Sequence, residues 1–372
     1  MLRSSGLLRR VSWPGAMRSG AFGILPACLL GLLLTGTLAG PALAADADDM
    51  PPLPHPVKLT ACIFDPAGKN GPIASTTSDL VLDARRWGLI VEPHIYTDEK
   101  VAADDFAAGQ CEIVGISTLR AGQFSRTVGS IDAPGNLRSY DEAKTLIRVM
   151  AQPDFMPFTY FGRYQVIGVI PIGSVFVMLR DRNMASIDKI AGKKVAVLDW
   201  NKSQARMIES LGAQPVPSDL TNFGGKFNNG MVDVIAAPAL FYEPLELYRG
   251  IGTKGGIVRF PIMEATGSLL LRRDLVLPKI PDLDARLLKM RGYGLRFVDD
   301  FVRRLKQTEA RIPQSAWIDL SPEDQKRYSR MLREARLKMT ADGVYDTNMM
   351  QLLRKVRCKY QPSNEECSLY DE

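Results

Sequence analysis

The chain has 372 residues, of which 46% are hydrophobic and 24% are charged, and this length and composition suit a folded protein of two lobes with ample core. The formal net charge is +6, but four arginines lie within the first 44 residues, and the remainder carries 43 basic residues against 41 acidic ones. This near balance excludes the basic stripe of a nucleic-acid-binding protein.

The N-terminal segment has the pattern of an export signal. An apolar run spans residues 21–38, the small residues of Ala42-Leu43-Ala44 follow it, and the arginines before it are Arg3, Arg9, Arg10 and Arg18. We expect cleavage after Ala44 and a periplasmic mature protein. The alternative, an uncleaved membrane anchor, needs a longer run without the glycines and proline that interrupt this one.

The next part of the chain predicts an α/β lobe. A Pro-rich and Asp-rich leader, residues 45–56, is expected to be disordered. Strands and helices then alternate, as in a doubly wound sheet. The expected elements are strands at Val57–Phe64, Ile90–His94 and Glu112–Ser117, and helices at Ser78–Trp87 and Ala102–Ala108.

A sequence pattern occurs twice and predicts a second lobe of the same plan. Residues 106–114 (FAAGQCEIV) and 227–235 (FNNGMVDVI) share an aromatic residue, a glycine, an acid and a β-branched pair at identical spacing. In both places we expect a helix that ends at the glycine, followed by a short buried strand that the acid opens.

The remaining elements complete that second lobe and a helical tail. We expect crossing strands at Tyr164–Ile170 and Val175–Leu179, a strand at Lys194–Leu198, and a helix capped by Asn201. The chain returns through Ser268–Leu271 and becomes helical beyond Pro281, with a helix start at Ser321-Pro322. We expect the tail to pack on the first lobe and the hinge. The expected boundaries are 57–173 for the first lobe, 174–267 for the second, and 268–372 for the return strand and tail.

Several segments together resemble one family. Residues 187–197 (IDKIAGKKVAV), 211–217 (LGAQPVP) and 230–233 (GMVD) resemble the second lobe of TRAP-type periplasmic solute-binding proteins, and the match is closest to the AdeT type. The resemblance implies a periplasmic-binding-protein-like bilobal fold that captures a small molecule between its lobes for an inner-membrane transporter or an efflux component. It implies neither an enzyme nor a cofactor.

The chain also departs from the TRAP pattern. Those proteins place an arginine in the first strand of the second lobe, where it grips a substrate carboxylate, and the matching position here is Ala196. The polar pair that usually follows the glycine and acid is replaced by Ala236-Ala237 before Pro238. A dicarboxylate specificity is therefore not expected, and the wall of the second lobe should be more apolar.

Ligands of doubly wound lobes bind beyond the carboxyl ends of the strands, which predicts a cleft between four turns, at residues 64–71, 117–120, 199–203 and 236–242. Aromatic residues near such turns belong to the core more often than they contact a ligand, and Arg120 or Arg180 can equally form a surface ion pair. The candidate ligand-binding residues are Asp65, Lys69, Asn70, Thr118, Arg120, Arg180, Trp200, Asn201, Pro238 and Tyr242. With two histidines and no motif for a nucleophile, the sequence predicts no catalytic or metal site.

An alternative function belongs to another class: an envelope accessory protein of an efflux or transport assembly, which keeps the bilobal fold and acts by protein contact. A ligand-dependent change in stability would favour solute binding over this alternative.

Four cysteines follow the signal, and an oxidising compartment permits disulfides. Cys358 and Cys367 enclose a short polar loop, so we expect them to be bonded. Cys62 lies near the end of its strand whereas Cys111 opens another, and parallel neighbours would hold them apart. We expect these two to be buried thiols.

Overall fold

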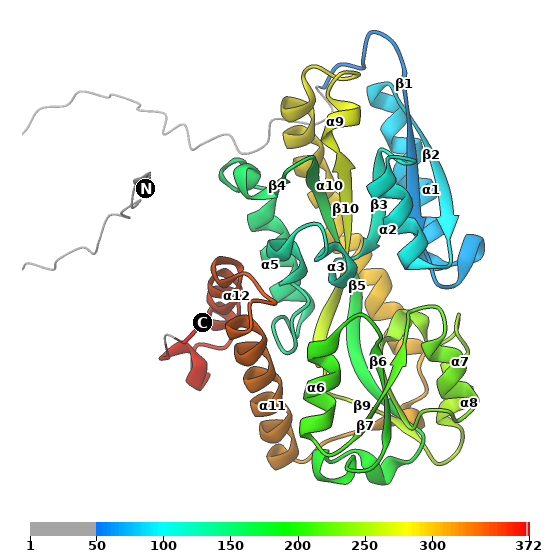
Figure 1. The fold of residues 1–372 in the computed structure, drawn as a ribbon, viewed down its shortest axis with the longest axis vertical. Coiled ribbons are helices and arrows are strands. Elements are labelled where there is room, and N and C mark those ends of the chain that lie inside the picture. The colour runs from blue at the N-terminus through cyan, green and yellow to red at the C-terminus, as the bar shows by residue number, and fades with distance from the viewer. Residues whose placement is uncertain (1–49, 370) are drawn as a thin grey trace, which may run out of the picture. The chain divides into compact units, whose positions relative to one another are not determined.

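One mixed β-sheet runs through the computed structural model, which describes residues 50–369 and 371–372 (Figure 1). All described residues belong to a single unit, Ala44–Glu372. The order of the main strands is β2-β1-β3-β10-β5-β8-β6-β7. Their bounds are β1 Val57–Phe64, β2 Leu89–Tyr96, β3 Ile113–Ser117, β5 Tyr164–Leu179, β6 Lys194–Leu198, β7 Gln214–Ser218, β8 Val234–Pro238 and β10 Met263–Arg272.

The two halves of the sheet repeat one topology. In what we call the first lobe, β2, β1 and β3 are parallel and β10 adds an antiparallel strand beside β3. In the second lobe, β7, β6 and β8 are parallel and β5 adds an antiparallel strand beside β8. Each lobe thus has its antiparallel strand at the same place, which confirms the bilobal α/β fold that the repeated sequence pattern predicts.

The acids of the repeated pattern make the same hydrogen bonds in both lobes. Glu112 donates its backbone N–H to the carbonyl of Thr60 (3.0 Å) and accepts from the Thr60 N–H through Oε2 (2.7 Å). Asp233 does the same with Lys194, at 2.8 and 2.9 Å. Each acid therefore fixes the start of the third parallel strand of its lobe against the first strand, and this explains why an acid recurs at that position.

The glycines of the pattern also have equivalent surroundings. Gly109 and Gly230 have positive φ values of 86° and 73° at the ends of their helices, a conformation that favours glycine. An arginine lies over each of them, Arg272 over Gly109 and Arg180 over Gly230, and a Cβ atom on Gly230 would lie 1.8 Å from Nη1 of Arg180. Arg272 is the last residue of the antiparallel strand β10 and Arg180 comes directly after the antiparallel strand β5, so the two arginines occupy equivalent places.

Two long strands connect the lobes. β5 is one continuous strand of 16 residues, where the sequence predicted two separate strands, and it pairs with β10 from Tyr164 to Val175. A bulge between Ala265 and Thr266 shifts the register opposite Ile172 and Gly173, and Gly173 has a φ of 127°. The expected lobe boundaries at 173/174 and 267/268 therefore fall inside these two strands.

Helices cover both faces of the sheet. The helices of the first lobe are α1 Pro72–Ala84, α2 Glu99–Ala108, α3 Thr118–Ala121, α4 Arg126–Gly129 and α5 Tyr140–Met150. Those of the second lobe are α6 Lys202–Ser210, α7 Phe223–Asn228 and α8 Leu247–Ile251. Short elements complete the chain up to the tail: β4 Tyr160–Phe161, β9 Gly256–Val258 and α9 Arg273–Val276, with β11 Trp317–Ile318 later pairing with β9. Each lobe has its own buried apolar clusters, and Phe106 and Phe227 of the repeated pattern are fully buried in theirs.

The C-terminal helices pack on both lobes. They are α10 Leu283–Arg311, α11 Pro322–Ala341 and α12 Thr347–Tyr360. Ser321 caps α11 by accepting from the Asp324 N–H, as the sequence predicts (3.1 Å). Met350 and Leu353 of α12 belong to the core of the first lobe, as expected, but Tyr328 and Leu332 of α11 belong to a cluster of the second lobe. The expectation of a tail on the first lobe and hinge is incomplete for α11, which packs on both lobes, since its Met339 lies in the first-lobe core.

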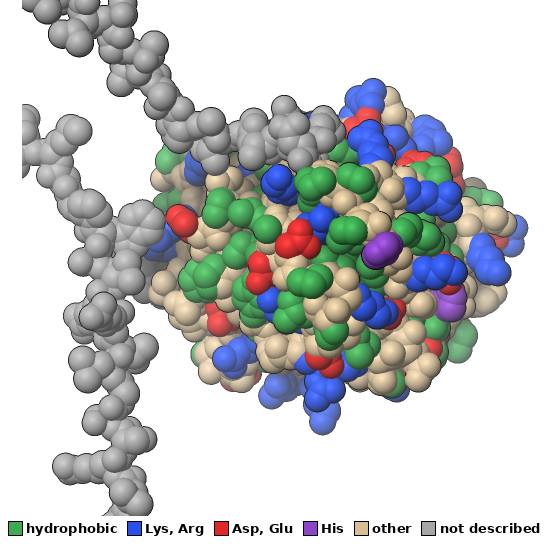
Figure 2. Space-filling view, turned by 90° about the horizontal axis from the view of Figure 1, so that it is seen from above, with side chains coloured by type: hydrophobic (Ala, Val, Ile, Leu, Met, Phe, Trp, Pro, Cys, Tyr) green, Lys and Arg blue, Asp and Glu red, His purple; other side chains and the backbone are tan. Residues whose placement is uncertain are grey.

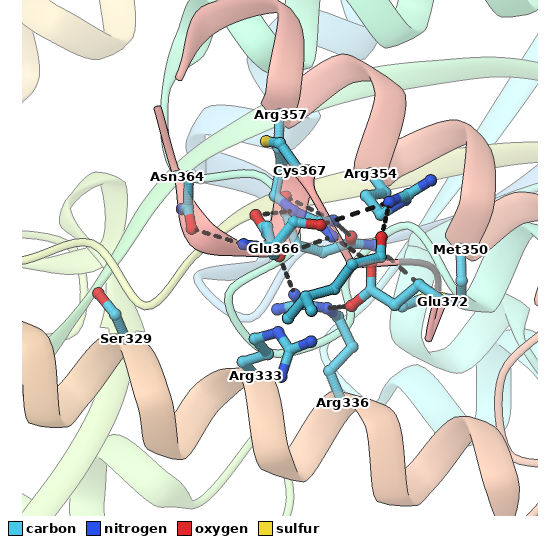
Figure 3. A network of polar contacts seen from close by, with 12 residues as sticks. Ser329, Arg333, Arg336, Met350, Arg354, Arg357, Asn364, Glu366, Cys367 and Glu372 are labelled. Atoms are coloured by element: carbon cyan, nitrogen blue, oxygen red, sulfur yellow. Dashed lines mark hydrogen bonds and ion pairs between the residues drawn. The ribbon is translucent and has the colours of Figure 1, made fainter. Parts of the chain in front are cut away.

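A buried network of ion pairs joins α11, α12 and the last residues (Figure 3). Arg336 donates to Glu366 (2.8 Å) and Glu372 (2.6 Å), and Arg357 contacts the same two carboxylates. The side chains of all four are at most 6% exposed. Because both charges of each pair are removed from water, loss of one partner should be costly.

Both cysteine pairs form disulfides. Cys358 and Cys367 are bonded as expected, with Cα atoms 5.6 Å apart. Cys62 and Cys111 are also bonded, with Cα atoms 5.8 Å apart, so the expectation of two thiols was wrong. The reason is the register: Ala61 lies opposite Ile113 and Cys62 opposite Val114, so Cys111, two residues before β3, is close enough to Cys62 for a bond.

Residues 50–56 were expected to belong to a disordered leader, but they lie against the first lobe. Met50 is buried beside Trp87 and Tyr293, and Pro51 accepts a hydrogen bond from Arg286 (2.8 Å). These residues are held by contacts with distant segments, which the composition of the leader does not predict. The predicted signal, its cleavage site and residues 45–49 lie outside the described residues.

The surface shows mixed charge. Figure 2 looks onto the end of the first lobe, where basic, acidic and hydrophobic side chains are interspersed. This mixture agrees with the near balance of charges after residue 44. No helix within the described part of the chain is long and apolar enough to span a bilayer.

Candidate functional site: a cavity between the two lobes

A cavity of about 640 Å³ lies where the carboxyl ends of the parallel strands of both lobes meet. Phe64 of β1 and Ser117 of β3 line it from the first lobe, and Leu198 of β6 and Pro238 of β8 line it from the second. Such strand ends are where doubly wound sheets bind ligands. The volume falls within the range of small-molecule sites.

The lining is largely apolar. The second lobe contributes Ala196 and Ala236, at the positions where the sequence predicts a wall without polar groups. The crossing strands, α1 and α10 supply further apolar side chains, among them Leu80, Ile170, Ile172, Ile262, Leu269, Met290, Phe301 and Leu305. Ser117, Gln204, Ser218, Thr266 and Ser268 are among the polar residues.

Asp65 does not face this cavity. It is fully buried, and its carboxylate accepts from the N–H groups of Ala67 (2.9 Å), Ile73 (2.8 Å) and Ala74 (3.0 Å). Burial raises the pKa of Asp65, while these backbone hydrogen bonds act in the opposite direction. Its carboxylate therefore fixes the start of α1 and the turn that precedes it.

Thr118 is also fully buried, in a chain of side-chain hydrogen bonds under the cavity. Its Oγ1 lies 2.7 Å from Oγ of Ser268 and 2.7 Å from Oγ1 of Thr266. Thr266 and Ser268 line the cavity, so Thr118 supports the lining from behind.

Arg120 and Trp200 come together from different lobes. The Arg120 guanidinium stacks on the Trp200 ring, 4.4 Å from its centroid. Behind it, Glu99 accepts from Arg120 Nε (3.4 Å) and from the Ser117 N–H (2.7 Å). Burial raises the pKa of Glu99, against the lowering effect of Ser117 and Arg120.

The other candidates have separate locations. Asn201 caps α6 by accepting from the Gln204 N–H (3.0 Å), and Tyr242 is buried in a second-lobe cluster. Lys69 and Asn70 are exposed in the turn before α1. Arg180 lies beside Gly230, near the first residue of β8, whereas Pro238 is the last residue of that strand. Of the ten candidates, only Pro238 lines the cavity itself.

The sequence reasoning missed Asp132, which lines the cavity and is 1% exposed. Its Oδ2 accepts from the Thr266 N–H (2.9 Å) and its Oδ1 from Thr266 Oγ1 (2.7 Å). Burial raises the pKa of Asp132 to about 7, although the Thr266 hydrogen bonds lower it. Since Thr266 lies 134 residues away, no local signal identifies this aspartate.

The arrangement is suited to holding a small molecule. Within the described residues, no group of three or more His, Cys, Asp or Glu side chains is placed to bind a metal ion. What the lining offers is apolar surface with a few polar groups that can fix an orientation.

Comparison with known proteins agrees with this geometry. The family model described as "Solute-binding protein AdeT 1/2" matches residues 81–372. The chain belongs to this family. It is 36% identical over 317 residues to "Probable solute-binding protein AdeT1" of Acinetobacter baumannii, covering 83% of this chain and 100% of the relative. Membership of the AdeT 1/2 family makes this chain a solute-binding protein.

Solved structures show the same fold. A TRAP periplasmic solute-binding protein from Ralstonia eutropha H16 with bound (S)-2-acetolactate has a TM-score of 0.66 at 12% identity, covering 81% of this chain and 99% of the other. A TRAP periplasmic solute-binding protein from Rhodoferax ferrireducens with bound malonate has a TM-score of 0.66 at 13% identity, covering 82% and 99%. Because their sequence identities are only 12% and 13%, these two structures establish the bilobal fold of this AdeT 1/2 family member and no more.

Proposed function

We propose that the cavity between the lobes is the solute-binding site of this protein, and that the loaded protein presents its solute to a membrane transport partner. The observation that carries this proposal is that strand ends from both lobes line one apolar cavity of about 640 Å³: Phe64 and Ser117 from the first lobe, and Leu198, Ser218 and Pro238 from the second. A site shared by two lobes can bind by closing around its ligand.

Contacts across the cavity support this proposal. Besides the pair of Arg120 and Trp200, Thr221 Oγ1 of the second lobe donates to the carbonyl of Thr97 in the first (3.1 Å). Leu220, which lines the cavity, packs against core clusters of both lobes. These contacts join the two lobes next to the cavity.

A cavity-filling variant tests the site. A thermal-shift screen of metabolites and drugs on the native protein should yield hits, because a ligand that binds only the folded state stabilises it by about 2.7 kcal/mol at a hundredfold excess over its Kd. Ala236→Trp places an indole in the cavity and should abolish the shifts. Ala341→Trp, on the exposed end of α11, is the matched control and should retain them.

The outcomes separate the two functions under consideration. Hits that persist in Ala236→Trp would place the solute elsewhere. If a broad screen yields no hit and the chain co-purifies with a membrane assembly, it acts by protein contact instead.

We further propose that the protein is exported to the periplasm and loses residues 1–44. Two disulfides in the described part of the chain suit an oxidising compartment. N-terminal sequencing of periplasmic material should start at Ala45, and recovery of Met1 in a membrane fraction would contradict the proposal.

A further inference from the structure

The charges around the cavity are unevenly placed. Asp132 is the acidic lining residue, and it is buried. The basic lining residues are Arg304 and Arg311, which are exposed on α10. Arg304 pairs with Asp300 (2.7 Å), and its side chain is 60% exposed, so water screens its charge. The buried part of the lining therefore contains a carboxyl group and no basic side chain.

Asp132 has no ion-pair partner among the described residues. Its two oxygens accept only from Thr266, and a carboxylate buried without a cation is unfavourable. The ionisable groups near enough to interact electrostatically with it are Glu264 of β10 and the phenol of Tyr345, and neither supplies a positive charge. Burial raises the pKa of Glu264 to about 8, so this carboxyl group is mostly neutral at pH 7 and supplies no counterion. A positive charge is what the floor of the cavity lacks.

We propose, on the basis of the function proposed above, that the solute of this protein is an organic amine whose ammonium group pairs with Asp132 while its apolar body fills the cavity. The ammonium supplies the missing counterion, and a hydrogen bond between two charged groups is stronger than one between neutral groups. The body contacts side chains such as Ile172, Leu198 and Phe241. A carboxylate solute, such as the acetolactate and malonate bound by the two structural neighbours, would meet Asp132 and Ala196 instead of a buried cation.

A matched series of probes tests the charge. 4-Phenylbutylamine, 4-phenylbutan-1-ol and 4-phenylbutanoate share one apolar skeleton and differ in the terminal group. By calorimetry at pH 7.5, the amine should bind most tightly and the acid most weakly. Asp132→Asn keeps the shape and an acceptor for Thr266. It should weaken amine binding about tenfold or more, and change alcohol binding by less than about twofold.

Proton release gives a second readout. Because burial raises the pKa of Asp132 to about 7, the group is mostly protonated at pH 6 and must lose its proton when an ammonium binds. Calorimetry at pH 6 in buffers of different ionisation enthalpy should therefore detect close to one proton released per amine bound. Release should be absent with the alcohol, with Asp132→Asn, and for the native protein at pH 9.

Binding data can show separately whether the solute is an amine and whether the cavity is the binding site. Tightest binding of the acid, equal effects of Asp132→Asn on amine and alcohol, or no amine binding at all would overturn the amine assignment. If screen hits or alcohol binding are still blocked by Ala236→Trp, the cavity remains the site. Probe binding that Ala236→Trp leaves intact would contradict the site itself, and the amine assignment with it.

Discussion

The guanidinium carbon of Arg120 lies 4.4 Å from the ring centroid of Trp200, and this stack joins α3 to the turn after β6. Glu99, buried behind Arg120, restricts the guanidinium to this position by accepting from its Nε. The two residues belong to different lobes and neither lines the cavity, so the stack can stabilise the arrangement of the lobes around a solute without touching it.

Trp200→Ala should weaken solute binding. A cation–π contact of a partly buried arginine contributes about 1 kcal/mol, which corresponds to roughly a fivefold rise in Kd. Trp200→Phe, which keeps an aromatic face, should retain most of the affinity. Trp317 is the matched control because it stacks under Arg259 (4.9 Å) away from the cavity, and Trp317→Ala should change stability but leave Kd unaltered. Equal Kd values for native protein and Trp200→Ala would show that the stack does not contribute to binding.

The two disulfides should differ in their effect on stability. Cys62 and Cys111 are 49 residues apart and Cys358 and Cys367 only 9. Chain-entropy arguments give about 4 kcal/mol for closing the longer loop and about 2.5 kcal/mol for the shorter one. Denaturant unfolding of the two double alanine variants, Cys62→Ala/Cys111→Ala and Cys358→Ala/Cys367→Ala, measures both. A larger loss for the Cys358 and Cys367 pair would contradict the prediction.

Glu366→Gln should destabilise the C-terminal region at neutral pH. It leaves Arg336 and Arg357 buried with one carboxylate fewer, and breaking a buried ion pair costs about 3 kcal/mol. Burial alone would raise the pKa of Glu366, but Arg357 and Arg336 outweigh it and hold the pKa below the usual 4.5.

The pH dependence of this effect has a definite sign. A depressed pKa stabilises the folded state above the unfolded pKa, and that stabilisation is lost as the pH falls through the folded value. The difference in unfolding free energy between native protein and Glu366→Gln should therefore shrink below about pH 4. Glu365→Gln, in an exposed neighbour, is the control. A difference that stays constant down to pH 3 would exclude the ion pairs as its cause.

Glu264→Gln should have the opposite pH dependence. Burial raises the pKa of Glu264 to about 8, against the hydrogen bond from Ser174, and its Oε2 is buried without a hydrogen-bond partner. The folded state therefore binds a proton that the unfolded state has released, and the native protein loses stability as the pH rises from 4.5 to about 8.

Glutamine stays neutral, so the variant should lack this loss. As the pH rises from 5 to 9, the free energy of unfolding of the native protein should fall relative to that of Glu264→Gln, by up to about 1.4 kcal/mol per pH unit. Glu92→Gln, exposed on β2, should follow the native profile. Parallel profiles for native protein and Glu264→Gln would contradict a buried neutral carboxyl group.

The repeated pattern at residues 106–114 and 227–235 was sufficient to predict two lobes of one plan, because its glycines and acids work through neighbours in the chain and the first strand of the same lobe. The caps at Asn201 and Ser321 were predictable for the same reason, since a cap binds an N–H three residues on. The apolar second-lobe wall at Ala196 and Ala236 also followed from the sequence, and both residues line the cavity.

Only the tertiary structure determined the contacts between residues that are far apart in the sequence. The register between β1 and β3 brings Cys62 to Cys111, and the packing of β10 under the loop after α4 brings Thr266 to Asp132. Most of the candidate residues instead fix turns, cap helices or lie in a core. Local sequence reveals hydrogen bonds and hydrophobic faces within a few residues. Which side chain finally lines a cavity between two lobes depends on strand register and lobe contacts, and these are set only when the whole chain packs.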